Sequence, residues 1–278
     1  MATYVIGDVH GCYNSLRALL RQLHFRADRD SLWFAGDLIN RGPASLDVLR
    51  FVYDLGPHAR MVLGNHELYV LASYFGVAQP NTLMAKVLTA HDANRLINWL
   101  RSQPLLLQQD RWLMVHAGIL PCLQPQQVCQ LAQQAQRTIQ SDRCRTVLQL
   151  WKHTQQPYNQ QLTWCPSLLS PVRDYVLLNM FTRMRFCTTP WQMDFSCTTH
   201  PHEAPTPLRP WFAYPRMQQW RRYTVLFGHW AALGLHQSRA CIGLDTGCSW
   251  GRQLTAFCLD TGRFYQQKCV DELPTNTV

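Results

Sequence analysis

The fold is decided by the opening stretch Tyr4-Val5-Ile6-Gly7-Asp8-Val9-His10-Gly11, in which a short apolar run ends in a glycine, a carboxylate and an imidazole. The arrangement recurs in Leu32-Trp33-Phe34-Ala35-Gly36-Asp37 and in Met61-Val62-Leu63-Gly64-Asn65-His66-Glu67. Short apolar runs bounded by glycine are typical of buried parallel strands. Because sites in open α/β sheets form at the carboxyl ends of the strands, we expect the three polar clusters to meet.

The spacing of the clusters supports one shared site. Asp8 and Asp37 are 29 residues apart, and Asp37 and Asn65 are 28 apart, each about the length of a strand-helix-strand unit. Carboxylate and amide oxygens beside imidazole nitrogens suit divalent manganese, cobalt, iron or zinc, and no thiolate is needed. The sequence therefore predicts a metal site at one edge of a sheet.

A resemblance to a known family becomes specific when five motifs are taken in order. They are Gly7-Asp8-Val9-His10-Gly11, Gly36-Asp37-Leu38-Ile39-Asn40-Arg41-Gly42, Gly64-Asn65-His66-Glu67, Val115-His116-Ala117-Gly118 and Gly228-His229-Trp230. This set resembles the phosphoprotein-phosphatase-type calcineurin-like metallophosphoesterases, and within them the bacterial symmetrical bis(5'-nucleosyl)-tetraphosphatases. Branch-specific segments are Phe181-Thr182-Arg183-Met184-Arg185-Phe186-Cys187, Pro210-Trp211-Phe212-Ala213 and Leu244-Asp245-Thr246-Gly247-Cys248. The resemblance covers residues 1 to about 260 of the chain.

The resemblance implies a ligand set of six residues for two divalent ions, which we expect to be manganese or cobalt. It implies that the first ion is held by Asp8 and His10, that Asp37 bridges both ions, and that the second is completed by Asn65, His116 and His229. The two late histidines also follow strand-like runs, Trp112–Val115 and Tyr223–Gly228. Their sequence context therefore agrees with the implied role.

Two ions bridged by one carboxylate can hold a hydroxide for in-line attack at phosphorus. Charge then spreads over the phosphoryl oxygens, so positioned guanidinium groups should stabilise the transition state. Arg41 lies between two ligand-bearing turns and is the first candidate. The resemblance implies a second phosphate contact from Arg183 or Arg185, and the sequence leaves this choice open.

His66 directly follows an expected ligand and is a candidate general acid for the leaving oxygen. The protein-phosphatase branch of the family has an aspartate at the position of Asn40, where it orients and charges this histidine. An amide can bond the ring but cannot stabilise the imidazolium. Because the terminal phosphate of a nucleoside diphosphate has a pKa of about 6, it departs without full protonation. Asn40 therefore favours phosphoanhydride over phosphomonoester substrates.

The basic charge is concentrated in one part of the chain. The formal net charge is +9, and residues 137 to 239 carry twelve basic and four acidic side chains, an excess of eight. Nearly all the basic residues are arginines, which suit bidentate contacts with phosphate. A tetraphosphate bridge is the expected partner. Nucleic acid is the rival, because arginines are interleaved with aromatic residues that could stack on bases, although we expect most of these rings in the core. The aromatic residues in question are Trp211, Phe212, Tyr214, Trp220 and Tyr223.

The chain of 278 residues, 47% apolar, is long enough for one domain spanning residues 1–278. We expect residues 137–239 to form a basic elaboration over the site, including a short helix at 171–184. Helical leucine stripes follow the first two clusters, and strand patterns at 242–244, 254–259 and 264–265 predict a second sheet. Together with the resemblance, these patterns predict an α/β fold: an α/β/β/α sandwich of two stacked mixed sheets flanked by helices.

Eleven cysteines without a Cys-x-x-Cys pair do not indicate a disulfide framework or a zinc ribbon. The first residues form neither a signal peptide nor a membrane span, so we expect a cytoplasmic protein without membrane contact. The sequence gives no evidence of an obligate protein partner.

These observations predict a two-metal hydrolase that cleaves diadenosine tetraphosphate and related dinucleotides symmetrically, yielding two ADP. The resemblance implies a further substrate, the nucleoside-tetraphosphate cap at the 5' end of RNA. Two alternatives stay open. A serine/threonine protein phosphatase would share the metal core, although Asn40 argues against it, and a nonhydrolytic nucleotide- or RNA-binding protein would lack a ligand that this chain retains.

Overall fold

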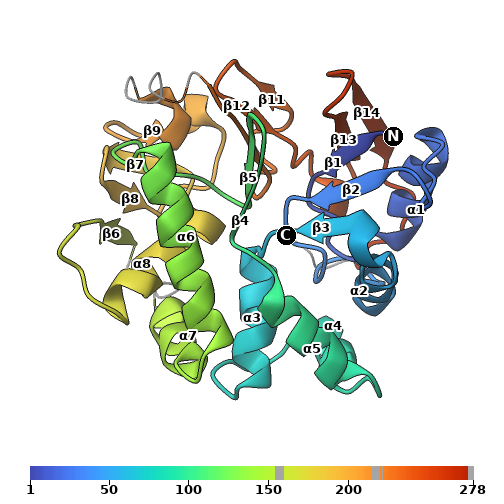
Figure 1. Cartoon of the computed structure of the whole chain (residues 1–278), viewed down its shortest axis with the longest axis horizontal. Coiled ribbons are helices and arrows are strands. Elements are labelled where there is room, and N and C mark those ends of the chain that lie inside the picture. Colours follow the sequence, from blue (N-terminus) through green and yellow to red (C-terminus); the bar gives the residue numbers. More distant parts are fainter. Residues whose placement is uncertain (154–159, 215–219, 221, 275–278) are drawn as a thin grey trace.

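The computed structural model describes residues 1–153, 160–214, 220 and 222–274, and it contains two five-stranded mixed sheets (Figure 1). The strands of the first sheet are, in spatial order, β14 (Phe264–Lys268), β13 (Gln253–Cys258), β1 (Thr3–Ile6), β2 (Ser31–Phe34) and β3 (Ala59–Met61). Those of the second are β11 (His236–Gln237), β12 (Cys241–Gly243), β10 (Thr224–Phe227), β5 (Trp112–Val115) and β4 (Leu106–Gln109).

Each sheet contains three neighbouring strands that run parallel. In the first sheet β1, β2 and β3 are neighbours, and in the second β5, β10 and β12 are neighbours, so the loops that follow them leave from common edges. The third strand was expected at Met61–Leu63, but β3 spans Ala59–Met61 and so lies two residues earlier in the chain. The chain stays close to β2 beyond that point, where the Val62 N–H donates to Phe34 O at 3.2 Å.

Alternation along the strands divides the core into two layers. Val5 and Trp33 of the first sheet share a buried cluster with Met114 and Leu226 of the second, so these side chains fill the space between the sheets. Ile6 and the other side chains on the opposite face of these strands point toward the helices. Both faces of the central strands are therefore apolar, which explains their near-continuous hydrophobic runs.

Helices cover the outer faces of the sandwich, as expected from the sequence (Figure 1). The leucine stripe of α1, including Leu16 and Leu19, packs against the first sheet, and Val48 and Leu49 of α2 belong to the same buried cluster. The helices are α1 (Tyr13–Gln22), α2 (Ser45–Asp54), α3 (Asn65–Tyr74), α4 (Thr82–Leu88), α5 (Ala93–Ser102), α6 (Pro125–Gln140), α7 (Cys144–His153) and α8 (Val172–Arg183).

The expected elaboration contains the anticipated helix, α8, but also a small third sheet that the sequence analysis did not predict. Its strands are β6 (Gln161–Thr163), β8 (Gln192–Asp194), β7 (Phe186–Thr189) and β9 (Arg209–Pro210). Strands of two to four residues are too short to show a period, which is why they were missed. Arg216 and Arg221 of the basic segment lie outside the described residues. That residues 137–239 form an elaboration within a single domain stays a prediction.

All eleven cysteines are free thiols, which agrees with the absence of a framework pattern. Among the residues that the structure describes, no helix combines the length and apolarity needed to cross a bilayer.

Candidate metal centre

Two loops, one after β1 and one after β2, are joined by backbone hydrogen bonds. The His10 N–H donates to Asp37 O at 2.8 Å, and the Gly11 N–H donates to Leu38 O at 2.7 Å. His10 and Asp37 each have φ of 49°, a left-handed conformation that is uncommon outside glycine and is concentrated at functional sites. The first two sequence clusters therefore form one surface.

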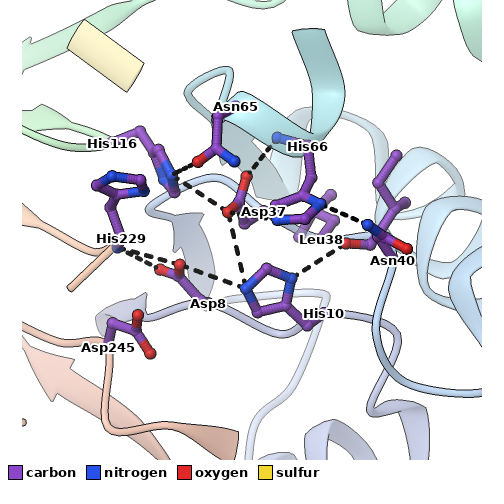
Figure 2. Close-up of polar contacts among 12 residues, drawn as sticks. Asp8, His10, Asp37, Leu38, Asn40, Asn65, His66, His116, His229 and Asp245 are labelled. Carbon is purple, nitrogen blue, oxygen red and sulfur yellow. Dashed lines mark hydrogen bonds and ion pairs between the residues drawn. The ribbon is translucent and has the colours of Figure 1, made fainter. Parts of the chain in front are cut away.

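Asp37 lies at the centre, where imidazole rings surround one of its carboxylate oxygens (Figure 2). Its Oδ2 is 3.3 Å from His116 Nε2, 3.7 Å from His10 Nε2 and 3.9 Å from His66 Nε2. Two trios of ligand-type atoms, each within 4.8 Å, share Asp37: they are His10, Asp37 and His66, and Asp37, His116 and His229. A carboxylate shared by two donor groups fits a pair of divalent ions.

Asp8 and Asn65 complete the set that the sequence nominated (Figure 2). The two Asp8 carboxylate oxygens accept the His229 backbone N–H at 3.1 and 3.0 Å, and Oδ2 is 3.7 Å from His10 Nε2. Asn65 Oδ1 lies 3.1 Å from His116 Nε2. The structure therefore brings together all six of the expected ligands.

Three of the histidines are held with one ring nitrogen turned away from the site and bonded to a backbone carbonyl. The pairs are His10 Nδ1 with Ile39 O at 3.1 Å, His116 Nδ1 with Ala35 O at 2.7 Å, and His229 Nε2 with Arg183 O at 3.0 Å. A carbonyl only accepts, so this nitrogen carries the proton. The other nitrogen of each neutral ring then offers its lone pair to the site, which is how metal-binding histidines are oriented.

Burial sets the protonation of the site. Burial, together with the charges of Asp245 and Asp37, raises the pKa of Asp8 well above its ordinary value. Burial also acts to raise the pKa of Asp37, but the adjacent histidines hold it well below the ordinary range. Burial lowers the pKa values of His10 and His229, which favours neutral rings. Burial also acts to lower the pKa of His116, but the adjacent Asp37 carboxylate outweighs it and raises that pKa. The donor set thus combines buried carboxylates with imidazoles, which suits divalent cations.

Glu67 has a structural role that the sequence analysis did not assign. Its carboxylate accepts the backbone N–H groups of Asp37 at 2.8 Å, Leu38 at 2.9 Å and Gly64 at 2.9 Å. Burial, followed by the charge of Asp37, raises the pKa of Glu67 to about 7, while its N–H donors oppose the shift. Glu67 ties the second and third loops together, and its place as the last residue of the third cluster was the available signal.

Asp245 was also missed as a site residue. It follows β12, the same kind of strand end that produced the other clusters, and it lines the cavity over Asp37. Burial raises its pKa, and the Gly247 N–H donates to its Oδ1 at 3.1 Å. A further buried carboxylate strengthens the negative field into which a cation would be drawn.

The two candidate arginines of the branch-specific segment have different surroundings. Arg185 lines the cavity, donates through Nη2 to His229 O at 2.9 Å, and has a buried Nε without a hydrogen-bond partner among the described residues. Burial lowers its pKa to about 10. Arg183 instead donates to Asn179 Oδ1 at 3.1 Å and stacks over Phe195 at 5.0 Å. Only Arg185 of this pair faces the candidate site.

A cavity of about 200 Å³ opens over Asp37 and gathers the predicted catalytic groups. Asn40, the predicted neighbour of His66, does not line it but contacts the His66 ring from behind, with Asn40 Nδ2 at 2.7 Å from His66 Nδ1. The lining residues are His10, Asp37, Arg41, Asn65, His66, Arg185, Thr198, His229, Ala231, Ala232, Asp245, Ser249 and Trp250.

Comparison with known proteins matches residues 1–231 to the calcineurin-like phosphoesterase family model. The chain belongs to this family. This phosphoesterase is 44% identical over 273 residues to the symmetrical bis(5'-nucleosyl)-tetraphosphatase of Yersinia pestis (strain Pestoides F), with 96% of this chain and 92% of the relative covered. The symmetrical bis(5'-nucleosyl)-tetraphosphatase of Yersinia pseudotuberculosis serotype O:3 (strain YPIII) is also 44% identical, over 275 residues, with 96% of this chain and 92% of that protein covered. The relatives confirm the resemblance that the motifs indicated.

Solved structures show that this phosphoesterase shares its fold with enzymes of different specificity. One provisionally assigned as a diadenosine tetraphosphatase has a TM-score of 0.63 at 22% identity, covering 96% of this chain and 93% of the other. A protein serine/threonine phosphatase of Saccharomyces cerevisiae has a TM-score of 0.54 at 16% identity, covering 99% and 82%. The fold alone does not separate a dinucleotide substrate from a phosphoprotein.

Proposed function

We propose that this phosphoesterase hydrolyses bis(5'-nucleosyl) tetraphosphates symmetrically, converting diadenosine tetraphosphate and water into two ADP. The observation that carries the proposal is the convergence of six ligand-type side chains, Asp37 at the centre and five others around it, beside a cavity that Arg41 and Arg185 line. The substrate class is supported by the names of the relatives at 44% identity across 96% of the chain.

The ligands in this proposal are Asp8 and His10 for one divalent ion, Asp37 for both, and Asn65, His116 and His229 for the other. We propose manganese or cobalt, from among the divalent ions that suit a donor set of carboxylate, amide and imidazole without thiolate. When bound, the ions would supply Lewis acidity toward phosphate oxygens and lower the pKa of water. The inward lone pairs of the three carbonyl-bonded histidines are the structural feature that fits such ions.

Phosphate binding falls to Arg41 and Arg185, which line the same cavity as Asp37. Arg185 is already desolvated, and its Nε has no hydrogen-bond partner in the described part of the chain, so its contact with a phosphoryl oxygen would supply a missing hydrogen bond. Guanidinium groups that are positioned before the substrate arrives stabilise the charge of the transition state without reorganisation. Arg183, bonded to Asn179, has no such role in this proposal.

The leaving group distinguishes a phosphoanhydride from a phosphomonoester. Burial lowers the pKa of His66 to about 3, so its ring is neutral at pH 7 and offers a hydrogen bond instead of a cationic acid. Asn40 contacts this ring with an uncharged amide. A departing nucleoside diphosphate needs little more than a hydrogen bond, whereas an alkoxide needs a proton. This difference favours the dinucleotide over the serine/threonine phosphoprotein.

A nucleoside contact is proposed at Trp250. Its side chain lines the cavity, is 46% exposed and carries Arg252 over its ring at 5.3 Å. Aromatic side chains of this kind stack on nucleobases. Two of the rings considered from sequence, Trp211 and Trp220, are fully buried and belong to the core.

Product analysis tests the function. The purified chain with Mn²⁺ and diadenosine tetraphosphate is expected to yield ADP alone by ion-exchange chromatography. ATP plus AMP would mean asymmetric cleavage, and binding without turnover would favour the nonhydrolytic alternative. A phosphopeptide run in parallel tests the protein-phosphatase alternative. RNA with a 5' nucleoside-tetraphosphate cap tests the extension to capped ends, which, like a cytoplasmic location, stays a prediction.

A further inference from the structure

Four histidine rings surround Asp37, and one of them is held differently from the others. His10, His116 and His229 each bond a backbone carbonyl through the nitrogen that faces away from the site. The outer nitrogen of His66 instead meets a side-chain amide, with Asn40 Nδ2 at 2.7 Å from His66 Nδ1 (Figure 2). Since an amide nitrogen donates, this contact has the opposite polarity.

The direction of the Asn40 amide is set from outside the site. Asn81 is the N-cap of α4, and its Oδ1 accepts the Met84 backbone N–H at 2.9 Å. A backbone N–H can only donate, so the Asn81 oxygen must face it and the Asn81 Nδ2 must face outward. That Nδ2 donates to Asn40 Oδ1 at 2.8 Å, which leaves Asn40 Nδ2 for His66.

The backbone of Asn40 is fixed independently of this chain of bonds. Its φ is 71°, a left-handed value that asparagine tolerates better than most residues, and its N–H donates to Ser45 Oγ at 2.9 Å. The backbone therefore fixes where the Asn40 side chain lies. The neighbouring side chains determine only whether its amide nitrogen or its amide oxygen faces His66.

We propose that Asn81 is a positioning residue for catalysis: through Asn40 it makes His66 Nδ1 an acceptor, so that the ring carries its hydrogen on Nε2 and presents a donor to the cavity. His66 Nε2 lies 3.9 Å from Asp37 Oδ2, on the cavity side of the ring. His66 is then a donor to the oxygens of the substrate, in contrast to the three rings that offer lone pairs. This inference rests on the proposed function for its catalytic meaning, but not for the orientation itself.

Substitutions at Asn81 can separate the orienting role from helix capping. Asn81→Asp keeps an N-cap oxygen for Met84 but replaces the donor by an acceptor, so the Asn40 amide is expected to turn and its Oδ1 to face His66. Asn81→Ser keeps a cap oxygen but removes the amide Nδ2 that donates to Asn40. Thr82→Ala, at the exposed first residue of α4, is the matched control because it leaves the Asn81 amide in place.

The first readout is the tautomer of His66, measured by NMR of the ¹⁵N-histidine-labelled full chain, without metal and with diamagnetic Mg²⁺. The His66 signals are identified by their absence in His66→Gln. We expect hydrogen on Nε2 in the wild type and in Thr82→Ala, a shift to Nδ1 in Asn81→Asp, and a mixture in Asn81→Ser. Hydrogen on Nδ1 in the wild type, or an unchanged tautomer in Asn81→Asp, overturns the proposal.

The second readout is kinetic. A donor used only in the transition state affects kcat, so Asn81→Asp should lower kcat for diadenosine tetraphosphate about tenfold with KM unchanged. The effect of Asn81→Ser should vanish in an Asn40→Ala background, because the two residues act in series. A loss that persists in full there means that Asn81 acts elsewhere and overturns the proposal. A wild type that forms no ADP refutes the proposed function, while the tautomer measurement still decides the orientation.

Discussion

Gly228 provides the sharpest test of the candidate metal centre, because its substitution displaces an expected ligand without replacing one. The residue follows β10, and its φ is not left-handed, so alanine adopts the backbone without strain. An added Cβ would lie 3.1 Å from Asp8 Cγ and well inside 3.0 Å of Asp8 Oδ1. Asp8 is buried and bonded to the His229 N–H, so its carboxylate must move.

A displacement of about 1 Å at a catalytic group costs on the order of 100-fold. At 1.36 kcal/mol per tenfold, Gly228→Ala should therefore lower kcat/KM by about 2.7 kcal/mol of transition-state stabilisation. The affinity for the more weakly held of two Mn²⁺ ions should fall by about 10- to 100-fold, as for lost ligand support. Initial rates on diadenosine tetraphosphate and calorimetric titration of metal-free protein with Mn²⁺ measure the two effects.

Gly262→Ala is the opposite control. Nothing lies within 4 Å of its added Cβ, but its φ of 68° costs alanine about 1–2 kcal/mol of stability. It should melt lower than the wild type and bind Mn²⁺ normally, whereas Gly228→Ala should lose metal affinity whatever its melting temperature. The reasoning is refuted if Gly228→Ala binds two ions with wild-type affinity and keeps its rate.

Three further predictions concern the leaving group, pH and the nucleoside. Asn40→Asp gives His66 a partner that stabilises its protonated ring, so the ratio of the rate on p-nitrophenyl phosphate to the rate on diadenosine tetraphosphate should rise about tenfold. His66→Ala should reduce hydrolysis of the monoester more than hydrolysis of the anhydride. An unchanged ratio in Asn40→Asp, or equal losses in His66→Ala, would remove the leaving-group argument. Because the pKa of Asp8 is raised in the folded protein, its stability contribution is complete below about 3.8 and is lost as pH rises through the folded value. Metal-free Asp8→Asn should therefore melt above the metal-free wild type at pH 7, with the gap closing toward pH 4 in EDTA scans; a gap independent of pH contradicts this. Trp250→Ala should raise KM for the dinucleotide about tenfold with little change in kcat, because base stacking contributes about 1–3 kcal/mol. Trp250→Phe keeps an aromatic ring, so its KM should stay near the wild-type value. Equal KM values in the wild type and both variants would exclude the stacking contact.

The strands and their terminal clusters were predictable because each is encoded locally. An apolar run such as Trp112–Val115 must be buried on both faces, and the polar residue that ends it must lie at a sheet edge. The structure confirmed that run as β5 without a shift in its bounds. The short strands of the third sheet have no such pattern, since two to four residues do not complete a recognisable alternation.

The choice between Arg183 and Arg185 shows where local pattern fails. Both lie in one motif two residues apart, but α8 ends at Arg183 and the next residue, Met184, is extended with ψ of 133°. The chain changes direction there, so Arg185 reaches the cavity and Arg183 contacts its own helix at Asn179. Neither residue type nor spacing carries that information.

The sequence by itself determined which side chains stand at the ends of buried strands, and from their chemistry that together they make a candidate site for divalent ions. Only the tertiary structure decided how each is held: Glu67 reaches back 30 residues to Asp37, and Asn81 reaches back 41 to Asn40. These contacts join segments whose proximity is created by sheet order and helix packing. Hydrogen-bond direction, and with it the state of every ring in the site, is therefore a property of the assembled fold and of no single stretch of chain.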